Sequence, residues 1–260
     1  MSQPPLAQRT EFAGTLARNA GALARRYFLG ELAFEVESKG GEQDWVSVAD
    51  RAVESFIRES IARRYPGDTM LGEEDGGTES ARLWIVDPID GTLNFVHGMR
   101  YWCVSIAYVE DGTRKVGAIY DPSLDELFLA AAGRGAQCNG APIRVSGCTS
   151  LDRALISQGF VHRHDLERHL DLRRSLLQSG AAVKDPGAGA LMLAHVAAGR
   201  FDAFYEPHMH SWDACAGLLL IEEAGGRVAP YPGPRGIAEG GAVLGTSPAL
   251  FEPLRALVGN

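Results

Sequence analysis

Two aspartates three residues apart, Asp87 and Asp90, carry the strongest chemical signal in this sequence. They follow the apolar run Leu83 to Val86, which is typical of a buried strand whose last residue is exposed at a turn. Pro88 should break the strand ladder, so that both carboxylates converge on one point while the Ile89 carbonyl turns toward it. Hard oxygen ligands of this kind suit Mg²⁺ rather than zinc. An Asp-Pro turn followed by an aspartate helix cap is the competing interpretation of the same residues.

Residues beside this pair favour an anionic ligand. Gly91 and Thr92 could open a helix directly after Asp90, and the free N–H groups at a helix start bind anions. Two more acidic segments, Gly72 to Asp75 and Ser211 to Asp213, lie before and after this region in the chain. Taken alone, the first is typical of a solvated turn and the second of an acidic helix start. Taken together with Asp87 and Asp90, they favour a metal site.

The overall charge narrows the classes of function. The 260 residues carry 33 acidic and 25 basic side chains, a formal net charge of −8. This balance argues against nucleic-acid binding, because phosphate backbones are held mainly by Lys and Arg. It also opposes an anionic substrate, unless acidic side chains gather cations that reverse the local field. The first residues lack the apolar core of a secretory signal. No charge-free stretch reaches the roughly 18 residues of a membrane span. We therefore expect a cytoplasmic protein without a membrane partner.

The pattern of apolar residues predicts a layered α/β fold. Val48 to Tyr65 is typical of an amphipathic helix, and Cys103 to Leu129 of an antiparallel meander of three strands. The later apolar helices Leu191 to Ala198 and Ala214 to Ala224 alternate with short strands. Such alternation indicates stacked layers of helices and sheets.

Three motifs, taken together, resemble the inositol monophosphatase family. The matching residues are Trp84 to Phe95, then Trp212-Asp213 followed by Ala216-Gly217 and by Glu223 to Gly226, and finally Lys39 followed by Asp50. They occur in the order and approximate spacing that the family uses, so chance is a poor explanation. The resemblance implies an αβαβα sandwich of the inositol monophosphatase and fructose-1,6-bisphosphatase type, with metals between two lobes, and a homodimer.

The resemblance also implies a set of metal ligands. Glu73, Asp87 and the Ile89 carbonyl would bind one Mg²⁺ ion, and Asp87, Asp90 and Asp213 would bind a second. Glu73 would contact a third, weaker ion through water, so two to three Mg²⁺ ions are expected. Asp90 and Asp213 would border the bound substrate as well.

The same resemblance assigns phosphate binding and catalysis to residues beside those ligands. Gly91 and Thr92 would donate backbone N–H groups to the phosphate. Glu73 and Thr92 would hold the water that attacks phosphorus, and Asp50 would accept a hydrogen bond from the Thr92 hydroxyl. An in-line displacement by water requires no covalent phosphoenzyme.

The substrate end of the resemblance is weaker. A family sequence of Gly followed by Ser or Thr corresponds here to Gly187 and Ala188, so Ala188 removes one possible hydrogen-bond donor. Glu206 corresponds to a family glutamate and could bind a ring hydroxyl or an amine. Glu74 and Lys39 would stay close to the site, with Lys39 adding positive charge.

A weakly marked boundary near Ser150 predicts two lobes. Residues 1–150 would form an N-terminal α+β lobe that carries most of the metal ligands. Residues 151–260 would form a C-terminal α/β lobe that carries the last ligand, Asp213, and the substrate contacts.

These expectations converge on a Mg²⁺-dependent, Li⁺-sensitive phosphatase of a small phosphorylated polyol, sugar or amino alcohol. Inositol 1-phosphate is the leading substrate, and histidinol phosphate is the alternative, because Glu206 beside Ala188 is compatible with either. A regulatory protein that binds the transcription machinery is the alternative from another class, since some bacterial relatives act in that way. The full set of acidic ligands argues that catalysis is retained.

Overall fold

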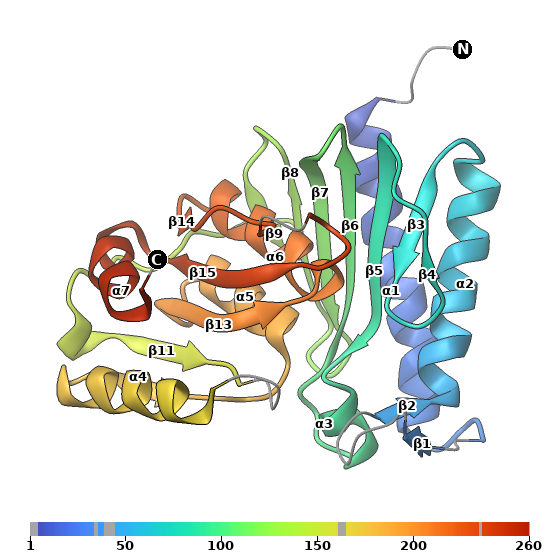
Figure 1. Ribbon diagram of the computed structural model, residues 1–260. Coiled ribbons are helices and arrows are strands. Elements are labelled where there is room, and N and C mark those ends of the chain that lie inside the picture. Colours follow the sequence, from blue (N-terminus) through green and yellow to red (C-terminus); the bar gives the residue numbers. More distant parts are fainter. Residues whose placement is uncertain (1–4, 34–35, 39–44, 161–164, 234–235, 260) are drawn as a thin grey trace.

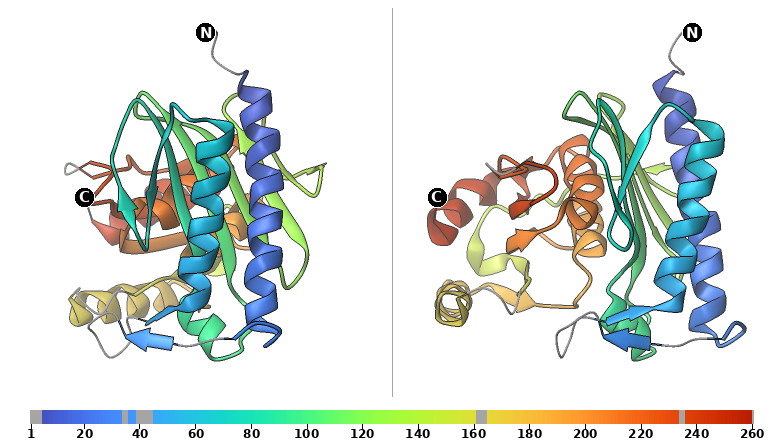
Figure 2. Two further views of the ribbon diagram at one scale, coloured as in Figure 1. Left: turned by 90° about the vertical axis from the view of Figure 1, so that its right-hand side faces the viewer. Right: turned by 45° about the vertical axis from the view of Figure 1, so that its right-hand side comes forward.

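The computed structural model describes residues 5–33, 36–38, 45–160, 165–233 and 236–259. Within them the chain builds five layers in the order helix, sheet, helix, sheet, helix (Figure 1, Figure 2). The helices are α1 Leu6–Phe28, α2 Val48–Arg64, α3 Thr92–Val96, α4 Leu166–Gln178, α5 Gly189–Ala197, α6 Ser211–Glu223 and α7 Phe251–Val258. The strands are β1 Val36–Ser38, β2 Trp45–Ser47, β3 Thr69–Gly72, β4 Gly76–Gly77, β5 Arg82–Asp90, β6 Cys103–Glu110, β7 Thr113–Asp121, β8 Glu126–Ala131, β9 Ala136–Cys138, β10 Ala141–Pro142, β11 Leu155–Gln158, β12 Ala182–Lys184, β13 Ala203–Met209, β14 Arg227–Val228 and β15 Gly241–Thr246. The predicted αβαβα sandwich is confirmed.

The first sheet contains eight strands of the described chain, in the order β10-β9-β8-β7-β6-β5-β3-β4. The run from β5 to β9 is an antiparallel meander, as predicted for Cys103 to Leu129, whereas β3 pairs in parallel with β5. On one face, α2 buries Val53, Ile57 and Ile61, whose four-residue spacing places them on one side of a helix. α2 ends one residue earlier than predicted, before Pro66.

α1 lies beside α2 on the same face of this sheet (Figure 2). Its buried face consists mostly of small residues, among them Ala13, Ala17, Ala20 and Gly21. A Cβ atom added at Gly21 would collide with the ring of Tyr120 on β7. The small side chains therefore let α1 approach the sheet closely.

The second sheet has five strands in the described chain, in the order β12-β11-β13-β15-β14. β12, β11 and β13 run parallel, while β15 is antiparallel to β13 and β14. α5 and α6 fill the space between the two sheets, and α4 and α7 cover the outer face (Figure 2). The predicted helices Leu191 to Ala198 and Ala214 to Ala224 are confirmed, with α6 beginning three residues earlier at Ser211.

The strand that carries the aspartate pair differs from the prediction. Pro88 does not end it, because β5 continues to Asp90. Its pairing with β6 instead shifts register between Asp87 and Asp90. Such an irregularity accommodates a proline, which has no N–H group to donate to the ladder.

The two sheets share one core. The first sheet ends at Pro142, and the second begins at Leu155. A hydrophobic cluster joins them through α5 and α6 and includes Ile85, Leu193 and Val243. The division into lobes near Ser150 stays a prediction. No helix in the described part of the chain is both long and apolar enough to cross a membrane.

Candidate active site

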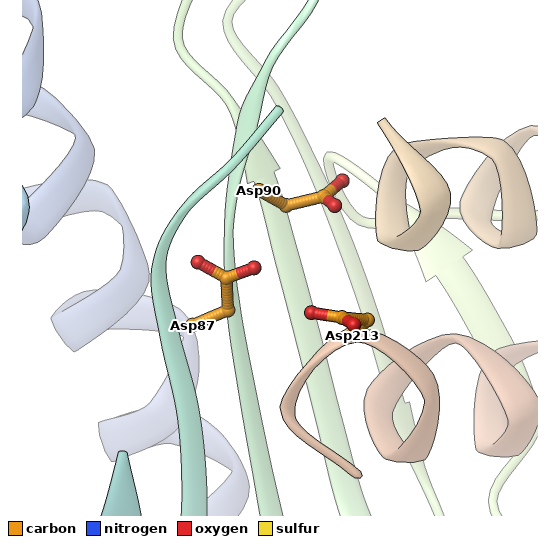
Figure 3. Close-up of side chains that lie close together, drawn as sticks. All are labelled: Asp87, Asp90 and Asp213. Carbon is orange, nitrogen blue, oxygen red and sulfur yellow. The ribbon is translucent and has the colours of Figure 1, made fainter. Parts of the chain in front are cut away.

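Three aspartates from distant parts of the chain converge between the sheets. Asp87 and Asp90 lie near the end of β5, and Asp213 lies in the first turn of α6. One carboxylate oxygen of each lies within 4.8 Å of the other two, and Figure 3 shows the side chains grouped beside β5 and the start of α6. Asp87 and Asp90 are buried, and Asp213 is half-buried. Carboxylates this close can share one cation.

The irregularity in β5 explains how Asp87 and Asp90 come together. In a regular strand, residues three positions apart face opposite sides of the sheet. The register shift at Pro88 and Ile89 removes that alternation, so both side chains enter the same space. The Ile89 N–H donates to Asp87 Oδ1 at 2.8 Å and fixes the carboxylate. The predicted convergence of the pair is confirmed, by a bulge rather than by the end of a strand.

Asp90 is held at the start of α5. Its Oδ2 accepts the backbone N–H of Leu191 at 3.1 Å and the thiol of Cys103 at 3.4 Å. Burial raises the pKa of Asp90 to about 6, while the N–H of Leu191 and the thiol of Cys103 act in the opposite direction. The N-terminus of a helix stabilises an anion, so α5 helps to keep Asp90 ionised.

The other two aspartates repel the charges around them. Burial raises the pKa of Asp87 well above its ordinary value, and the charges of Glu73 and Asp213 raise it further. Burial also raises the pKa of Asp213, with added repulsion from Glu73 and Asp90. Crowded carboxylates of this kind are stabilised by a cation.

Glu73 belongs to a turn that α2 holds in place. The Glu73 N–H donates to the Val86 carbonyl at 3.2 Å, which ties the turn to β5. The next two N–H groups, of Glu74 and Asp75, donate to the carboxylate of Glu54 at 2.8 and 3.1 Å. Glu54 is fully buried and pairs with Arg58 at 2.6 Å. Glu73 lines the cavity beside the three aspartates but stands outside their cluster.

Thr92 and Asp50 lie within reach of each other. The Thr92 hydroxyl is 3.4 Å from Asp50 Oδ1 and 3.1 Å from the Ile89 carbonyl oxygen, so it has two possible acceptors. Gly91, which precedes α3, has φ 88°, and a Cβ atom there would lie 2.9 Å from the Cβ of Ala188. Glycine is therefore required at this tight turn. The catalytic roles expected for Glu73, Thr92 and Asp50 stay predictions.

The three aspartates, Glu73, Gly91 and Thr92 border a cavity of about 270 Å³, whereas Asp50 lies outside its lining. Its acidic lining residues are Glu73, Asp87, Asp90, Asp185, Glu206 and Asp213, and no lysine or arginine of the described chain lines it. Ile89, Gly91, Thr92, Gly187 and Ala188 also line it. Most of the predicted site residues therefore share one cavity. Glu74 lies in the turn after Glu73 rather than in the lining, and Lys39 lies outside the described residues.

Mg²⁺ fits the chemistry of this donor set. Mg²⁺ prefers oxygen ligands, and the cavity offers carboxylates and a backbone carbonyl without cysteine thiolates as ligands. The four carboxylates of Glu73, Asp87, Asp90 and Asp213 repel one another without a lysine or arginine among the described lining residues. A divalent cation would remove this repulsion.

Three residues near the site escape the sequence interpretation. Asp185 lines the cavity directly after β12. Asn94 in α3 donates its side-chain N–H groups to the carbonyls of Tyr101 and Pro186, both at 2.8 Å, and so joins α3 to the loop that holds Asp185. Glu54 supports the turn that carries Glu73. Asp185 precedes a proline as Asp87 does, and that shared Asp-Pro signal could have indicated it.

Five alternating layers around a buried carboxylate cluster define a layered α/β protein with a site suited to divalent cations and phosphate. The chain belongs to the inositol monophosphatase family, a group of Mg²⁺-dependent phosphatases, because the family's sequence model matches residues 6–258.

Individual relatives agree with this assignment. The chain is 39% identical over 247 residues to a protein of Pseudomonas aeruginosa named Nus factor SuhB, covering 92% of this chain and 91% of the relative. It is 40% identical over 243 residues to an inositol-1-monophosphatase of Mesorhizobium japonicum, with 92% and 91% covered. Among solved structures, the extragenic suppressor protein suhB of Bartonella henselae superposes with a TM-score of 0.89 at 33% identity, covering 96% of this chain and 98% of that one. An inositol monophosphatase of Thermotoga maritima gives 0.86 at 33% identity, with 96% of each chain covered.

Proposed function

We propose that this protein is a Mg²⁺-dependent phosphomonoesterase that releases phosphate from a small phosphorylated polyol, sugar or amino alcohol. The observation that carries the proposal is the convergence of Asp87, Asp90 and Asp213 within 4.8 Å, in a cavity shared with Gly91 and Thr92. Carboxylates in this arrangement hold a divalent cation beside a phosphate group.

Two to three Mg²⁺ ions are part of the proposal. Asp87, Asp90 and Asp213 would hold one ion, and Glu73, Asp87 and the Ile89 carbonyl would hold another. When bound, the ions would neutralise phosphate charge and favour attack by water. The membership of this chain in a Mg²⁺-dependent family supports that assignment.

The chain's own residues supply orientation and proton acceptance. The backbone N–H groups of Gly91 and Thr92 would fix the phosphate oxygens. With its hydroxyl proton directed to Asp50, Thr92 would present an oxygen lone pair to the attacking water. Glu73 would accept a proton from that water, because its carboxylate lines the same cavity as Thr92.

Inositol 1-phosphate is the leading substrate, and relatives named inositol-1-monophosphatase support it. The leaving alcohol would contact Glu206 and the backbone near Gly187 and Ala188, which line the same cavity. Histidinol phosphate is the alternative ester. Assembly as a homodimer stays a prediction that the mass of the protein in solution would check.

The test is phosphate release from inositol 1-phosphate, histidinol phosphate, sugar phosphates and nucleotides, with Mg²⁺ and with EDTA. We expect turnover of at least one small ester with Mg²⁺ and none with EDTA. Full turnover in metal-free buffer, or no turnover of any ester with Mg²⁺, would reject the proposed function.

A second candidate is a regulatory role, which the names of the SuhB relatives favour. Such a role does not require the carboxylate cluster to bind cations. An Asp87→Asn variant that remains folded distinguishes the two candidate functions. Loss of phosphatase activity together with retained binding to RNA polymerase extract would favour a dual role, whereas absence of binding in both proteins would exclude the regulatory one.

A further inference from the structure

Two of the six cavity carboxylates are not needed by the proposed cation sites. Glu73, Asp87, Asp90 and Asp213 surround the proposed ions, whereas Asp185 and Glu206 come from the second sheet. A phosphate ester is itself an anion. Two further carboxylates near its leaving group would repel it, unless that part of the substrate carries positive charge.

The topology brings these two residues to one edge of the second sheet. β12, β11 and β13 are parallel and adjacent, so their carboxyl ends meet at one edge of the sheet. Asp185 follows β12, Gly159 follows β11, and Glu206 lies in β13 next to Tyr205, whose carbonyl accepts the Gly159 N–H at 2.9 Å. Carboxyl ends of parallel strands are a common place for ligands to bind.

Gly159 makes room for the Glu206 carboxylate. A Cβ atom added at this position would collide with Glu206 Oε2. The absence of a side chain on the middle strand therefore gives the Glu206 carboxylate its place in the cavity. Any larger residue at 159 would displace the Glu206 carboxylate.

Neither acid is neutralised by the described protein. Glu206 is half-buried, yet it forms no hydrogen bond or ion pair with any described residue. Asp185 accepts the N–H of Gly187 and lies near Arg173 and His169 of α4, but it forms no ion pair with a described residue. Removing the Glu206 carboxylate from much of the solvent without giving it a partner among the described residues is costly, which points to a partner that arrives with the substrate.

The raised pKa of Glu206 is consistent with a partner that arrives with the substrate. Burial raises its pKa to about 8, and the charges of Asp185 and Asp90 add to the effect. A cation placed between Glu206 and Asp185 would favour the ionised form and release the proton.

We propose that Asp185 and Glu206 form a subsite for a protonated amine on the leaving alcohol, so that the preferred substrate is the phosphate ester of an amino alcohol. The proposal rests on the proposed function, because it concerns the alcohol that phosphate leaves. Asp185 is then a specificity-determining residue outside the cation sites. A neutral polyol phosphate enters the same cavity but leaves both carboxylates uncompensated.

The experiment compares matched esters that differ in one group. 2-Aminoethyl phosphate and 3-aminopropyl phosphate are paired with 2-hydroxyethyl and 3-hydroxypropyl phosphate. Histidinol phosphate and inositol 1-phosphate are measured beside these pairs as larger esters with and without an amine. The measured quantity is the ratio of kcat/KM for the amine to that for its neutral partner, in wild type, Asp185→Asn and Glu206→Gln. Glu167→Gln is the control, because it removes the same charge from the exposed start of α4.

We expect at least one amine to be preferred by about tenfold or more in wild type, as a charge-assisted contact would give. The ratio should fall toward one in both site variants and stay unchanged in the control. Because Asp185 is exposed at the rim of the cavity, its variant should fold normally, which thermal unfolding will check.

Three results would overturn the subsite. The first is a wild-type ratio of one or less, and the second is a preference for the amine that survives either substitution. The third is a preference that is lost on going from limiting to excess Mg²⁺, which would mean that a metal ion binds between Asp185 and Glu206. Phosphate release from the neutral esters distinguishes these failures from failure of the proposed function, in which no ester is hydrolysed.

Discussion

The carboxylate of Glu54 should control both stability and turnover, although it lines no part of the cavity. It is fully buried in α2, accepts two backbone N–H groups from the turn after Glu73, and pairs with Arg58. Gly72 lies against it, so closely that a Cβ atom there would collide with the carboxyl group. Substitution of Glu54 by alanine would release the turn that carries Glu73.

The loss of unfolding free energy in Glu54→Ala depends on which groups lose an ion-pair or hydrogen-bond partner. Removing one member of a buried ion pair costs about 3–5 kcal/mol. Arg58 is one-third exposed, with 33% of its side-chain surface accessible, and the freed N–H groups lie in a partly exposed turn. Water can therefore solvate much of what is left, and we expect the lower end, about 3 kcal/mol, or a decrease in Tm of about 6 °C for a chain of this size.

The effect on turnover should be larger than the effect on folding. A displacement of about 1 Å in a group that positions reactants can lower the rate about 100-fold. We expect kcat/KM of Glu54→Ala to fall by about that factor at 25 °C, where the protein remains folded, with Glu54→Gln in between.

The assay combines urea unfolding with phosphate release at saturating Mg²⁺. Glu59→Gln is the matched control, because Glu59 is an exposed residue of the same helix and surface substitutions change stability by less than about 0.5 kcal/mol. A folded Glu54→Ala protein with wild-type kcat/KM would refute the reasoning, since the turn would then hold Glu73 without its support.

Three further outcomes are expected. Asp87→Asn should lower turnover by several orders of magnitude and Asp213→Asn by less, because Asp87 would serve two cations and Asp213 one; wild-type turnover in a folded Asp87→Asn protein would contradict the ligand assignment. Li⁺ should inhibit phosphate release uncompetitively with respect to substrate, and insensitivity at high millimolar Li⁺ would count against the cation site at Asp87, Asp90 and Asp213. In EDTA, the unfolding free energy of wild type relative to Glu206→Gln should fall between about pH 5 and pH 8, by at most about 1.4 kcal/mol per pH unit. The sign follows because the folded-state pKa of about 8 lies above the unfolded value. Between the two values the unfolded carboxyl is ionised while the folded one keeps its proton, so stability decreases as the pH rises toward 8. A difference that stays constant over this range would show that Glu206 is not a buried acid of raised pKa.

The helices and strands with a strong apolar period could be predicted from the sequence, and α1 could not. α2 repeats large apolar residues every four positions, which is the signal of an amphipathic helix. α1 instead buries alanine and glycine, such as Ala17, Ala20 and Gly21, against the sheet. Small residues carry little hydrophobic contrast, although they are what the close contact with Tyr120 requires. The longest helix of the described chain therefore lacks the period of large apolar residues that marks α2.

The bulge in β5 shows a second limit of local patterns. Asp87 and Asp90 indicate a shared site whether the strand ends at Pro88 or continues through it. The sequence supports both geometries, because proline is compatible with a strand end and with an irregular pair. Pairing with β6 decides between them, since Asp90 forms a ladder partner with Cys103. That partner lies too far along the chain for a local motif to reveal it.

The residues proposed to bind phosphate could be predicted from the sequence more completely than those proposed to bind the leaving alcohol. The reason is the topology of the fold. At the phosphate end, Asp87, Asp90, Gly91 and Thr92 come from one continuous segment, so their spacing alone predicts a common site. At the alcohol end, by contrast, the lining comes from the ends of three parallel strands separated by some twenty residues each.

Neither end is complete without contacts between the sheets. Leu191 donates to Asp90, and Asn94 donates to the Pro186 carbonyl, so the loop that carries Asp185 is placed by the phosphate end. A change in the alcohol end can therefore alter substrate choice while the motif at 84–95 stays intact. Substrate identity among relatives of this fold should follow the residues at 159, 185 and 206 rather than the motif, and the matched esters measure that dependence directly.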